Sequence, residues 1–396
     1  MKGISMTIKD RLPEIKDYVV AMRRYFHQHP ELSFEEVETT KTIAKELDKM
    51  GIPYEFSQEE PGVGLVALID SGRPGKALAL RADIDALTVF EKNEVPYKSQ
   101  VEGKMHACGH DGHTAILLGA AKLLNECRDE FDGKIYLIFQ PAEELGLGSK
   151  YMMRQGHWLE EVDNIFGAHV WVHLPVGTVS VEAGERMAAG DMFEIKIHGK
   201  SAHGSEPQSS VDAVLVGSAV VQALQAMVSR TYSPLDSVVV SVGTFEAGTR
   251  FNIIAGEARL TGTCRYFTQE IADRIDIDMD RIIKGVCEAY GAGYELEYNK
   301  VMGPLANDLA SSEIAEEAVR KVLGPDALIK MKKVTGGEDF SWYLKEKPGC
   351  FAFIGVGNPD KGASYSHHSD HFDMDEDALA GGAGVYAQYA LDYLNQ

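Results

Sequence analysis

The residues best suited to chemistry are concentrated at positions 105–114, which hold three histidines, a cysteine and an aspartate. Cys108 and His110 stand two apart, and a thiolate and a neutral imidazole are ligands that zinc and other transition metals prefer. Neighbouring glycines let the backbone bend so that both side chains can turn to one ion. Because a helical pattern begins at His113, we expect a helix N-terminus here, where an exposed thiolate of low pKa is favoured. The alternative is a helix cap that is merely rich in histidine.

Paired carboxylates follow two strand-like runs. Asp83 and Asp85 come at the end of one apolar run and, two apart, point to the same side of the chain. We expect one of them to ligate a metal or to orient a ligand. Glu143 and Glu144 follow the apolar run 133–140. One member of such a pair can bind metal while its neighbour takes a proton from water, although paired glutamates are also common on plain surfaces.

His169 is the polar interruption in a further apolar run, residues 164–172. Such a histidine is usually a satisfied core residue, but this one lies among strand exits that already carry candidate ligands, so we count it with them. A second loop dense in His and Asp, residues 364–373, precedes the final helix and is expected to close the cluster. Active sites gather at the carboxyl ends of parallel strands, so these side chains should meet there.

The elements that must position these residues alternate between helix and strand up to about residue 185 and again after about residue 300. This alternation is typical of an α/β domain with a mostly parallel, helix-flanked sheet. Between the two parts, a β-α-β-β-α-β order predicts an inserted ferredoxin-like α+β lid domain. We therefore predict a catalytic domain formed by residues 1–185 and 301–396, and a lid domain over residues 186–300.

Local patterns predict the first two helices. Apolar residues at helical spacing indicate a helix over about residues 8–28. Ser33 and Glu36 have the spacing of a capping box, which predicts the start of a second helix that stops at Gly51.

Composition bounds the expected partners and location. The 396 residues are 44% hydrophobic and 25% charged, as in soluble globular proteins, with a formal net charge of −21. A broad negative field repels phosphate groups, so neither nucleic acid nor a membrane is an expected partner. We expect no apolar run to be long enough to span a membrane, and the N-terminus lacks the apolar stretch of a signal peptide. Five cysteines without a C-x-x-C pair indicate a reducing compartment, and we expect a cytoplasmic protein.

The motifs, taken in order, resemble a known family. The chain carries His-Pro-Glu-Leu, Arg-Ala-Asp-Ile-Asp-Ala-Leu, Met-His-Ala-Cys-Gly-His-Asp-Gly-His, Gln-Pro-Ala-Glu-Glu, Gly-x-His, Ser-Ala-His-Gly, Asn-Ile-Ile and Gly-Glu-Asp-Phe. This order resembles the di-metal amidohydrolases related to aminoacylase, specifically the group with hippurate hydrolase, indole-acetyl-amino-acid hydrolase and N-acetyl-diaminopimelate deacetylase. The resemblance covers essentially the whole chain.

The resemblance implies a binuclear metal site and assigns residues to it. The implied ligands are Cys108, as the bridging group, with His110, Glu144, His169 and His368. Glu143 matches the general base, Asp85 matches the acidic residue that orients the site, and His203 and Asn252 match lid residues that contact substrate. The two ions are expected to be manganese or zinc, with cobalt or nickel possible for these ligand types. The family also implies a homodimer formed through the lid.

The implied reaction is hydrolysis of the amide bond of an N-acyl amino acid, such as an acetyl or benzoyl derivative, to a carboxylic acid and a free amino acid. Two alternatives stay open: a dipeptidase or carboxypeptidase using the same site, and a catalytically inactive binding module. The family's Leu-His-x-Pro motif is replaced here by His367-His368-Ser369-Asp370, so the choice of His368 rests on alignment. The roles of Asp83, His367 and His371 are left open.

Overall fold

The computed structural model describes residues 6–396 and divides the chain into two compact units. The first unit contains the residues through Gly184 together with Asn307–Lys332 and Trp342–Gln396. The second contains Glu185–Ala306 and Lys333–Ser341. The sequence placed the boundaries at 185/186 and 300/301, and it did not predict that Lys333–Ser341 would return to the second unit.

The first unit is built on a seven-stranded sheet of order β1-β2-β4-β3-β5-β15-β6. Its strands are β1 Tyr54–Phe56, β2 Leu65–Asp70, β3 Ala77–Asp83, β4 Lys134–Gln140, β5 Asn164–Pro175, β6 Val179–Ser180 and β15 Gly349–Gly357. The central strands β4, β3, β5 and β15 run parallel, whereas β1, β2 and β6 are antiparallel additions at the edges. The predicted α/β class with a mostly parallel sheet is confirmed. β3 is buried along its whole length, as expected of a strand covered on both faces.

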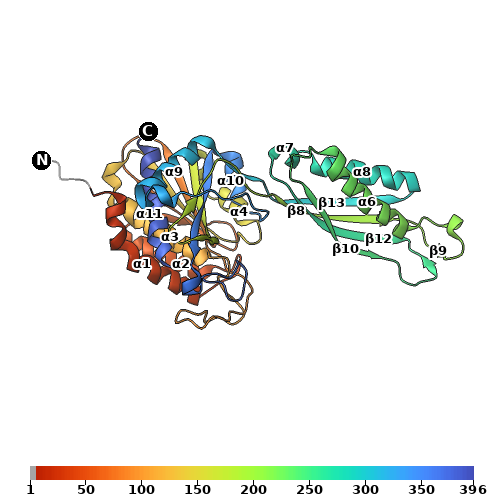
Figure 1. The fold of residues 1–396 in the computed structure, drawn as a ribbon, viewed down its shortest axis with the longest axis horizontal. Helices are drawn as coiled ribbons and strands as arrows, with labels where there is room; N and C mark the ends of the chain where they lie inside the picture. The colour runs from red at the N-terminus through yellow and green to blue at the C-terminus, as the bar shows by residue number, and fades with distance from the viewer. Residues whose placement is uncertain (1–5) are drawn as a thin grey trace. The chain divides into compact units, whose positions relative to one another are not determined.

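Helices of the first unit cover this sheet (Figure 1). They are α1 Ile8–Gln28, α2 Val37–Met50, α3 His110–Glu126, α4 Gly148–Met153, α5 Trp158–Glu161, α9 Leu309–Leu323, α10 Ser341–Glu346 and α11 Asp377–Leu394. The predicted first helix is found at its predicted limits, and its face of Ile15, Val19, Met22 and Phe26 is buried. α1, α3 and α11 pack on one another, so α1 lies directly against the helix that begins at His110.

The second unit has the predicted β-α-β-β-α-β order. Its elements are β8 Gly190–His198, α6 Ala213–Thr231, β10 Val239–Ala247, β12 Glu257–Arg265, α8 Ile275–Tyr290 and β13 Gly293–Met302. The four strands form an antiparallel sheet of order β10-β12-β8-β13. Two short pairs accompany it, β9 Ala202–His203 with β11 Ile253–Ile254, and β7 Gly184–Met187 with β14 Leu305–Asn307.

The helical region before β13 consists of α7 (Gln269–Ala272) and α8, because the chain leaves helical geometry at Arg274, where φ is −134°. The expectation that no apolar run approaches a membrane span is wrong for α6. Among the described residues, α6 is long and apolar enough, by length and composition alone, to span a membrane. One face of α6, including Val216, Val220 and Leu224, is buried in the core of the second unit, as in a core helix of a globular protein.

Candidate metal centre

The candidate site lies at the carboxyl ends of the central parallel strands. β3 ends just before Asp85, β4 ends just before Glu143 and Glu144, and β5 carries His169. The loop that leads into α3 brings Cys108 to the same edge, where its sulfur faces His169. Residues that are up to 84 positions apart in the sequence therefore meet because parallel strands place their carboxyl ends together.

The turn between Cys108 and His110 depends on glycine. Gly109 has φ of 97°, and a Cβ at this position would lie 2.4 Å from Cγ2 of Val170. Only glycine satisfies both restrictions, so the turn can lie flat against β5. Cys108 is buried, with 9% of its surface exposed, and the expectation of an exposed thiolate of low pKa is wrong. Burial and the nearby carboxylate of Glu144 raise the pKa of this thiol well above its usual range.

His110 has one ring nitrogen held and the other available. Its Nδ1 lies 3.1 Å from Oδ1 of Asp85, so Nδ1–H donates to that carboxylate. Its Nε2 is buried and makes no hydrogen bond with any described residue. One donor atom from each of Cys108, His110 and Glu144 lies within 4.8 Å of the other two. Asp85 also accepts a hydrogen bond from the backbone N–H of Glu144 at 3.1 Å, so it fixes two members of this group.

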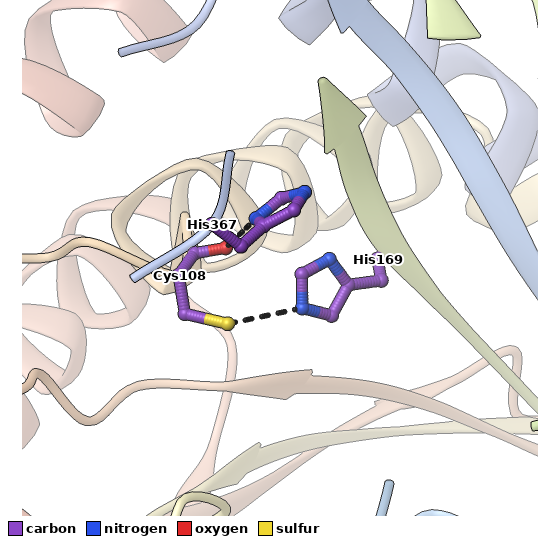
Figure 2. Close-up of side chains that lie close together, drawn as sticks. All are labelled: Cys108, His169 and His367. Atoms are coloured by element: carbon purple, nitrogen blue, oxygen red, sulfur yellow. Dashed lines mark hydrogen bonds between the residues drawn. The ribbon is translucent and has the colours of Figure 1, made fainter. Parts of the chain in front are cut away.

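His169 presents a second available nitrogen to the same sulfur (Figure 2). Its Nε2 lies 3.4 Å from Sγ of Cys108, and its Nδ1 lies 2.5 Å from the backbone oxygen of Val170. The Nδ1–H donates to that carbonyl, which leaves the Nε2 lone pair directed at the sulfur. Burial lowers the pKa of His169 well below its usual value, which favours the neutral imidazole that a metal requires.

His367 and His368 are the candidates for the remaining ligand. His367 belongs with Cys108 and His169 to a second group of donor atoms that lie within 4.8 Å of one another, and Figure 2 shows these three side chains together. However, Nδ1 of His367 lies 3.2 Å from the backbone oxygen of Cys108, and its Nε2 accepts from the N–H of Val172 at 3.3 Å. Both ring nitrogens are therefore engaged, and no lone pair is left for a metal. His368 lies outside the buried core of the group, and its Nε2 is 3.4 Å from Oε1 of Glu144. The bonding pattern therefore argues against His367, and the choice of His368 by alignment stays a prediction.

Left-handed backbone is concentrated around this site. Within residues 6–396, three residues other than glycine have positive φ: Phe34 (64°), Ala142 (53°) and His368 (68°). Ala142 immediately precedes Glu143, and the backbone N–H of His368 donates to the oxygen of Ala107 at 2.8 Å. A left-handed conformation costs a residue with a Cβ about 1–2 kcal/mol, so it persists where surrounding contacts impose it, most often at functional sites.

The donor set fits divalent transition metals. Sulfur, imidazole nitrogen and carboxylate oxygen converge from Cys108, His110, Glu144 and His169 in a buried space, and Nε2 of His110 has no other partner among the described residues. Buried anionic groups that face one another need a cation to compensate them. Cys108 lies close to the available nitrogens of both His110 and His169, as a ligand shared by two ions would.

A comparison with known proteins identifies the family. The sequence profile of "Peptidase family M20/M25/M40" matches residues 79–392. The chain belongs to this family. The resemblance inferred from the motifs is thereby confirmed, and the protein is an M20 hydrolase with the binuclear type of site.

Relatives of this M20 hydrolase share nearly its full length. The IAA-amino acid hydrolase ILR1-like 4 of Arabidopsis thaliana is 40% identical, with 96% of this chain and 86% of the relative covered. Thermostable carboxypeptidase 2 of Saccharolobus solfataricus is 38% identical, with 98% of each chain covered. The crystal structure of the Bacillus subtilis YXEP protein, described as a dinuclear metal-binding peptidase of the M20 family, has a TM-score of 0.84 and 34% identity, with 97% of this chain and 99% of that chain covered.

The two predicted lid residues of the M20 hydrolase lie together in the second unit. His203 ends β9, which pairs with β11, and the N–H of Gly204 donates to the backbone oxygen of Asn252 at 2.9 Å. The His203 side chain is exposed, and its Nδ1 is 2.7 Å from Oγ of Ser205. His371, the extra candidate in the last loop, instead pairs with Asp370 at 2.8 Å and belongs to none of the donor groups.

The structure shows the partners of Asp83, whose role the sequence left open. Its carboxylate is fully buried, with one oxygen 2.6 Å from Arg81 and the other 2.5 Å from Nδ1 of His113. His113 in turn accepts at Nε2 from the N–H of Val170 at 2.8 Å. The polar atoms of Asp83 and His113 thus find partners in one another and in neighbouring residues, which gives both residues a structural role beside the site.

Sequence reasoning missed an ionic network that ties α1 to the site loops. Arg23 is completely buried, and its guanidinium contacts Asp111 at 2.9 Å, Asp373 at 2.8 Å and Glu376 at 3.2 Å. Asp111 follows the ligand candidate His110 directly in the sequence. The signal was a basic residue on the otherwise apolar face of a predicted helix, one position after Met22, but nothing in the sequence named its partners.

Proposed function

We propose that this M20 hydrolase cleaves the amide bond of N-acyl amino acids, with Glu143 as its general base. The observation that carries the proposal is the position of Glu143, which is 5% exposed and has Oε2 3.9 Å from Nε2 of His110, at the edge of the donor group. Oε1 of Glu144 lies at the same 3.9 Å from this nitrogen, but Glu144 and not Glu143 belongs with Cys108 and His110 to the group of donors within 4.8 Å of one another. Glu143 is therefore beside this group rather than in it, where a general base is expected. The similarity to a plant hydrolase named for IAA–amino acid conjugates supports the N-acyl class.

In the proposed site, the two metal ions would be held by Cys108, His110, Glu144, His169 and His368. When bound, divalent ions lower the pKa of water and stabilise the negative charge that develops on the scissile carbonyl oxygen. The mixed sulfur, nitrogen and oxygen donors suit manganese or zinc, and they also permit cobalt or nickel.

In this proposal Glu143 acts twice. Its carboxylate takes a proton from the water that attacks the acyl carbon, and it then gives that proton to the nitrogen of the leaving amino acid. Asp85 has a positioning role, because it holds Nδ1 of His110 and the backbone N–H of Glu144. His203 and Asn252 are assigned to substrate contact from the lid, His203 by donating to the developing oxyanion.

A second candidate is peptide cleavage at the same site, because a relative of 38% identity is named a carboxypeptidase. The two activities differ in the group on the substrate nitrogen, which is an acyl group in one and an aminoacyl residue with a free amine in the other. Comparing an N-acetyl amino acid with a dipeptide of the same C-terminal residue separates them.

The first test is hydrolysis of a panel of acetyl, benzoyl and indole-acetyl amino acids by chelator-stripped protein, with and without manganese, zinc, cobalt or nickel. We expect metal-dependent release of a free amino acid. Glu143→Gln should lose turnover by at least about 10³-fold, within the usual range for general base catalysis, while it keeps its bound metal. A Glu143→Gln variant with full activity would refute the assignment. Release from dipeptides alone would support the second candidate, and metal-loaded protein inactive on both would favour a binding module.

We also propose a homodimer through the second unit. α6 exposes Val214 and Leu215, at 44% and 53%, and β10 is an edge strand with most of its residues exposed. Leu215→Glu should therefore shift the protein from dimer to monomer in analytical ultracentrifugation. A wild-type protein that sediments as a monomer would refute the proposed homodimer.

We also propose a cytoplasmic location. Burial of all five cysteines, none in a disulfide, supports it.

A further inference from the structure

The predicted capping box at the start of α2 is wrong, and its two residues have other partners. Glu36 is the N-cap residue but makes no side-chain capping hydrogen bond. The cap comes instead from Glu31, whose carboxylate accepts from the N–H groups of Glu38 and Thr39 at 3.1 and 2.8 Å. The side chains of Ser33 and Glu36 are therefore directed elsewhere, and both reach loops that carry the site.

Glu36 reaches the turn that presents Glu143. Its side chain is completely buried, and Oε1 accepts a hydrogen bond from the backbone N–H of Ala142 at 2.8 Å. Ala142 is the left-handed residue that immediately precedes Glu143, and the next turn closes with the N–H of Gly146 donating to the oxygen of Glu143 at 2.7 Å. A residue with a Cβ adopts this conformation when neighbouring contacts favour it. The bond from Glu36 is such a contact, made at the residue that sets the direction of Glu143.

Ser33 reaches the companion loop. Its Oγ donates to Oδ2 of Asp85 at 2.7 Å, and the same oxygen accepts from the N–H of Glu144. The other oxygen of Asp85 holds His110. Three residues of one short segment, Ser33, Phe34 and Glu36, thus include a left-handed residue and two side chains that bind the two site loops.

We propose that Glu36 is a positioning residue of the active site, which imposes the left-handed backbone at Ala142 and so aims the carboxylate of Glu143, with Ser33 serving Asp85 in the same way. This inference rests on the proposed role of Glu143 as general base. It assigns a function to the segment after the His-Pro-Glu-Leu motif, whose Ser33 and Glu36 side chains bond Asp85 and Ala142 rather than the assigned metal ligands.

The required chemistry of Glu36 is that of a hydrogen-bond acceptor and not that of a charge. Burial and the neighbouring Asp85 raise the pKa of the Glu36 carboxyl to about 9, and its Oε2 has no hydrogen-bond partner among the described residues. A neutral acid accepts through its carbonyl oxygen, and a glutamine at this position offers the same oxygen. Leucine has a similar size but offers no acceptor.

The test compares Glu36→Gln and Glu36→Leu in the metal-loaded enzyme. Glu46→Leu is the matched control, because Glu46 is a buried glutamate on the same helix that accepts from Tyr18 at 3.1 Å, away from the site. Measurements are kcat, KM, metal content, thermal stability and amide hydrogen exchange of the peptide that contains Ala142. We expect Glu36→Leu to lower kcat on the order of 100-fold with a smaller change in KM, as displacement of a catalytic group by about 1 Å does. Glu36→Gln should stay within about threefold of wild type.

A second variant keeps the inference testable if Glu36→Leu folds poorly. Glycine adopts left-handed backbone without penalty, so adding Ala142→Gly to Glu36→Leu should recover at least about tenfold in kcat. Glu46→Leu should lower thermal stability and leave kcat within about twofold. Equal losses of kcat in Glu36→Leu and Glu46→Leu would overturn the inference, as would a loss in Glu36→Gln as large as that in Glu36→Leu.

Hydrogen exchange distinguishes this inference from the proposed function. Faster exchange of the Ala142 amide in Glu36→Leu, but not in Glu36→Gln, reports the contact whether or not the right substrate has been found. Unchanged exchange in Glu36→Leu would overturn the positioning role even if the enzyme hydrolyses N-acyl amino acids. If the Ala142 amide exchanges faster in Glu36→Leu than in the wild type, as expected, but no substrate in the panel is hydrolysed, the positioning role stands and the proposed function is refuted.

Discussion

Replacement of Arg23 by methionine should destabilise the first unit strongly. Arg23 has no exposed surface, and its guanidinium faces three carboxylates, those of Asp111, Asp373 and Glu376. Methionine has a similar length and removes the charge. Asp111, which is also completely buried, would then keep His27 at 2.7 Å and the backbone N–H of Gly112 at 2.9 Å, but would lose its permanently charged partner. Removing one partner of a buried ion pair costs about 3–5 kcal/mol, because the remaining charge is left uncompensated.

The structure supplies a matched control in the next residue. Arg24 pairs with the same Glu376 at 2.6 Å, but its side chain is 47% exposed. An exposed ion pair contributes about 0–1 kcal/mol, so Arg24→Met should change stability little. For a domain of this size, 1 kcal/mol shifts the melting temperature by about 2–4 °C. Arg23→Met should therefore lower Tm by about 10 °C, and Arg24→Met by no more than about 3 °C.

The assay is thermal unfolding of both variants and the wild type at one pH, followed by scanning calorimetry, with metal content measured on the same samples. Because Asp111 follows His110 and Asp373 lies in the loop of His368, we also expect Arg23→Met to retain metal less well than Arg24→Met during dialysis against a chelator. Equal melting temperatures for the two variants would show that the network contributes no more than a surface ion pair, and the reasoning would fail.

Three further predictions concern the site and its pH dependence. Asp85→Asn should weaken metal binding about 10–100-fold, because it disturbs the partner that fixes Nδ1 of His110, and competition with a chelating dye measures the change. Cys108→Ala should leave fewer than two metal ions per subunit by elemental analysis, whereas an unchanged count of two would exclude a shared ligand. Burial opposes ionisation of Asp111, but Arg23 and His27 outweigh it and hold the pKa of Asp111 well below its usual value. The folded state therefore binds fewer protons than the unfolded chain, so the ionised Asp111 stabilises the fold above about pH 4, and this stabilisation is lost as the pH falls further. In urea unfolding between pH 7 and pH 3, the free energy of unfolding should therefore decrease less for Arg23→Met than for the wild type.

The sequence predicted features that depend on local pattern and failed where tertiary contacts decide. The first helix was predicted at its limits because apolar spacing and burial agree along α1. The sequence also predicted that Cys108, His110 and the carboxylates after β3 and β4 would meet, because parallel strands bring their carboxyl ends together. The exposure of Cys108 was wrong, because a helix N-terminus is a local property and burial beneath the surrounding loops is not.

The segment at Ser33 and Glu36 shows the same limit. Its residue types and spacing match a capping box, and the second helix does begin there. The side chains are nevertheless used at Asp85, 52 positions away, and at Ala142, 106 positions away. A local motif of polar residues cannot show which of two available partners, the adjacent helix or a distant loop, it serves.

Tertiary contacts likewise decide which histidines can be ligands and which are structural. Most of these contacts come from one strand, β5. Four imidazoles lie within reach of one another near Cys108, and β5 contacts three of them through its backbone. The N–H of Val170 donates to His113 and that of Val172 donates to His367, which occupies their lone pairs. The oxygen of Val170 instead accepts from His169, which leaves that residue a lone pair facing the sulfur.

His110, the fourth imidazole, is treated in the same way by Asp85, which accepts from Nδ1 and leaves Nε2 available. A backbone N–H thus removes a histidine from the ligand set, and an acceptor behind the ring keeps it in the set. By this rule His367, although it lies close to Cys108 and His169, has no lone pair left for a metal. It also predicts that the backbone oxygen of Val170 fixes the tautomer of His169, which burial keeps neutral, before any metal binds.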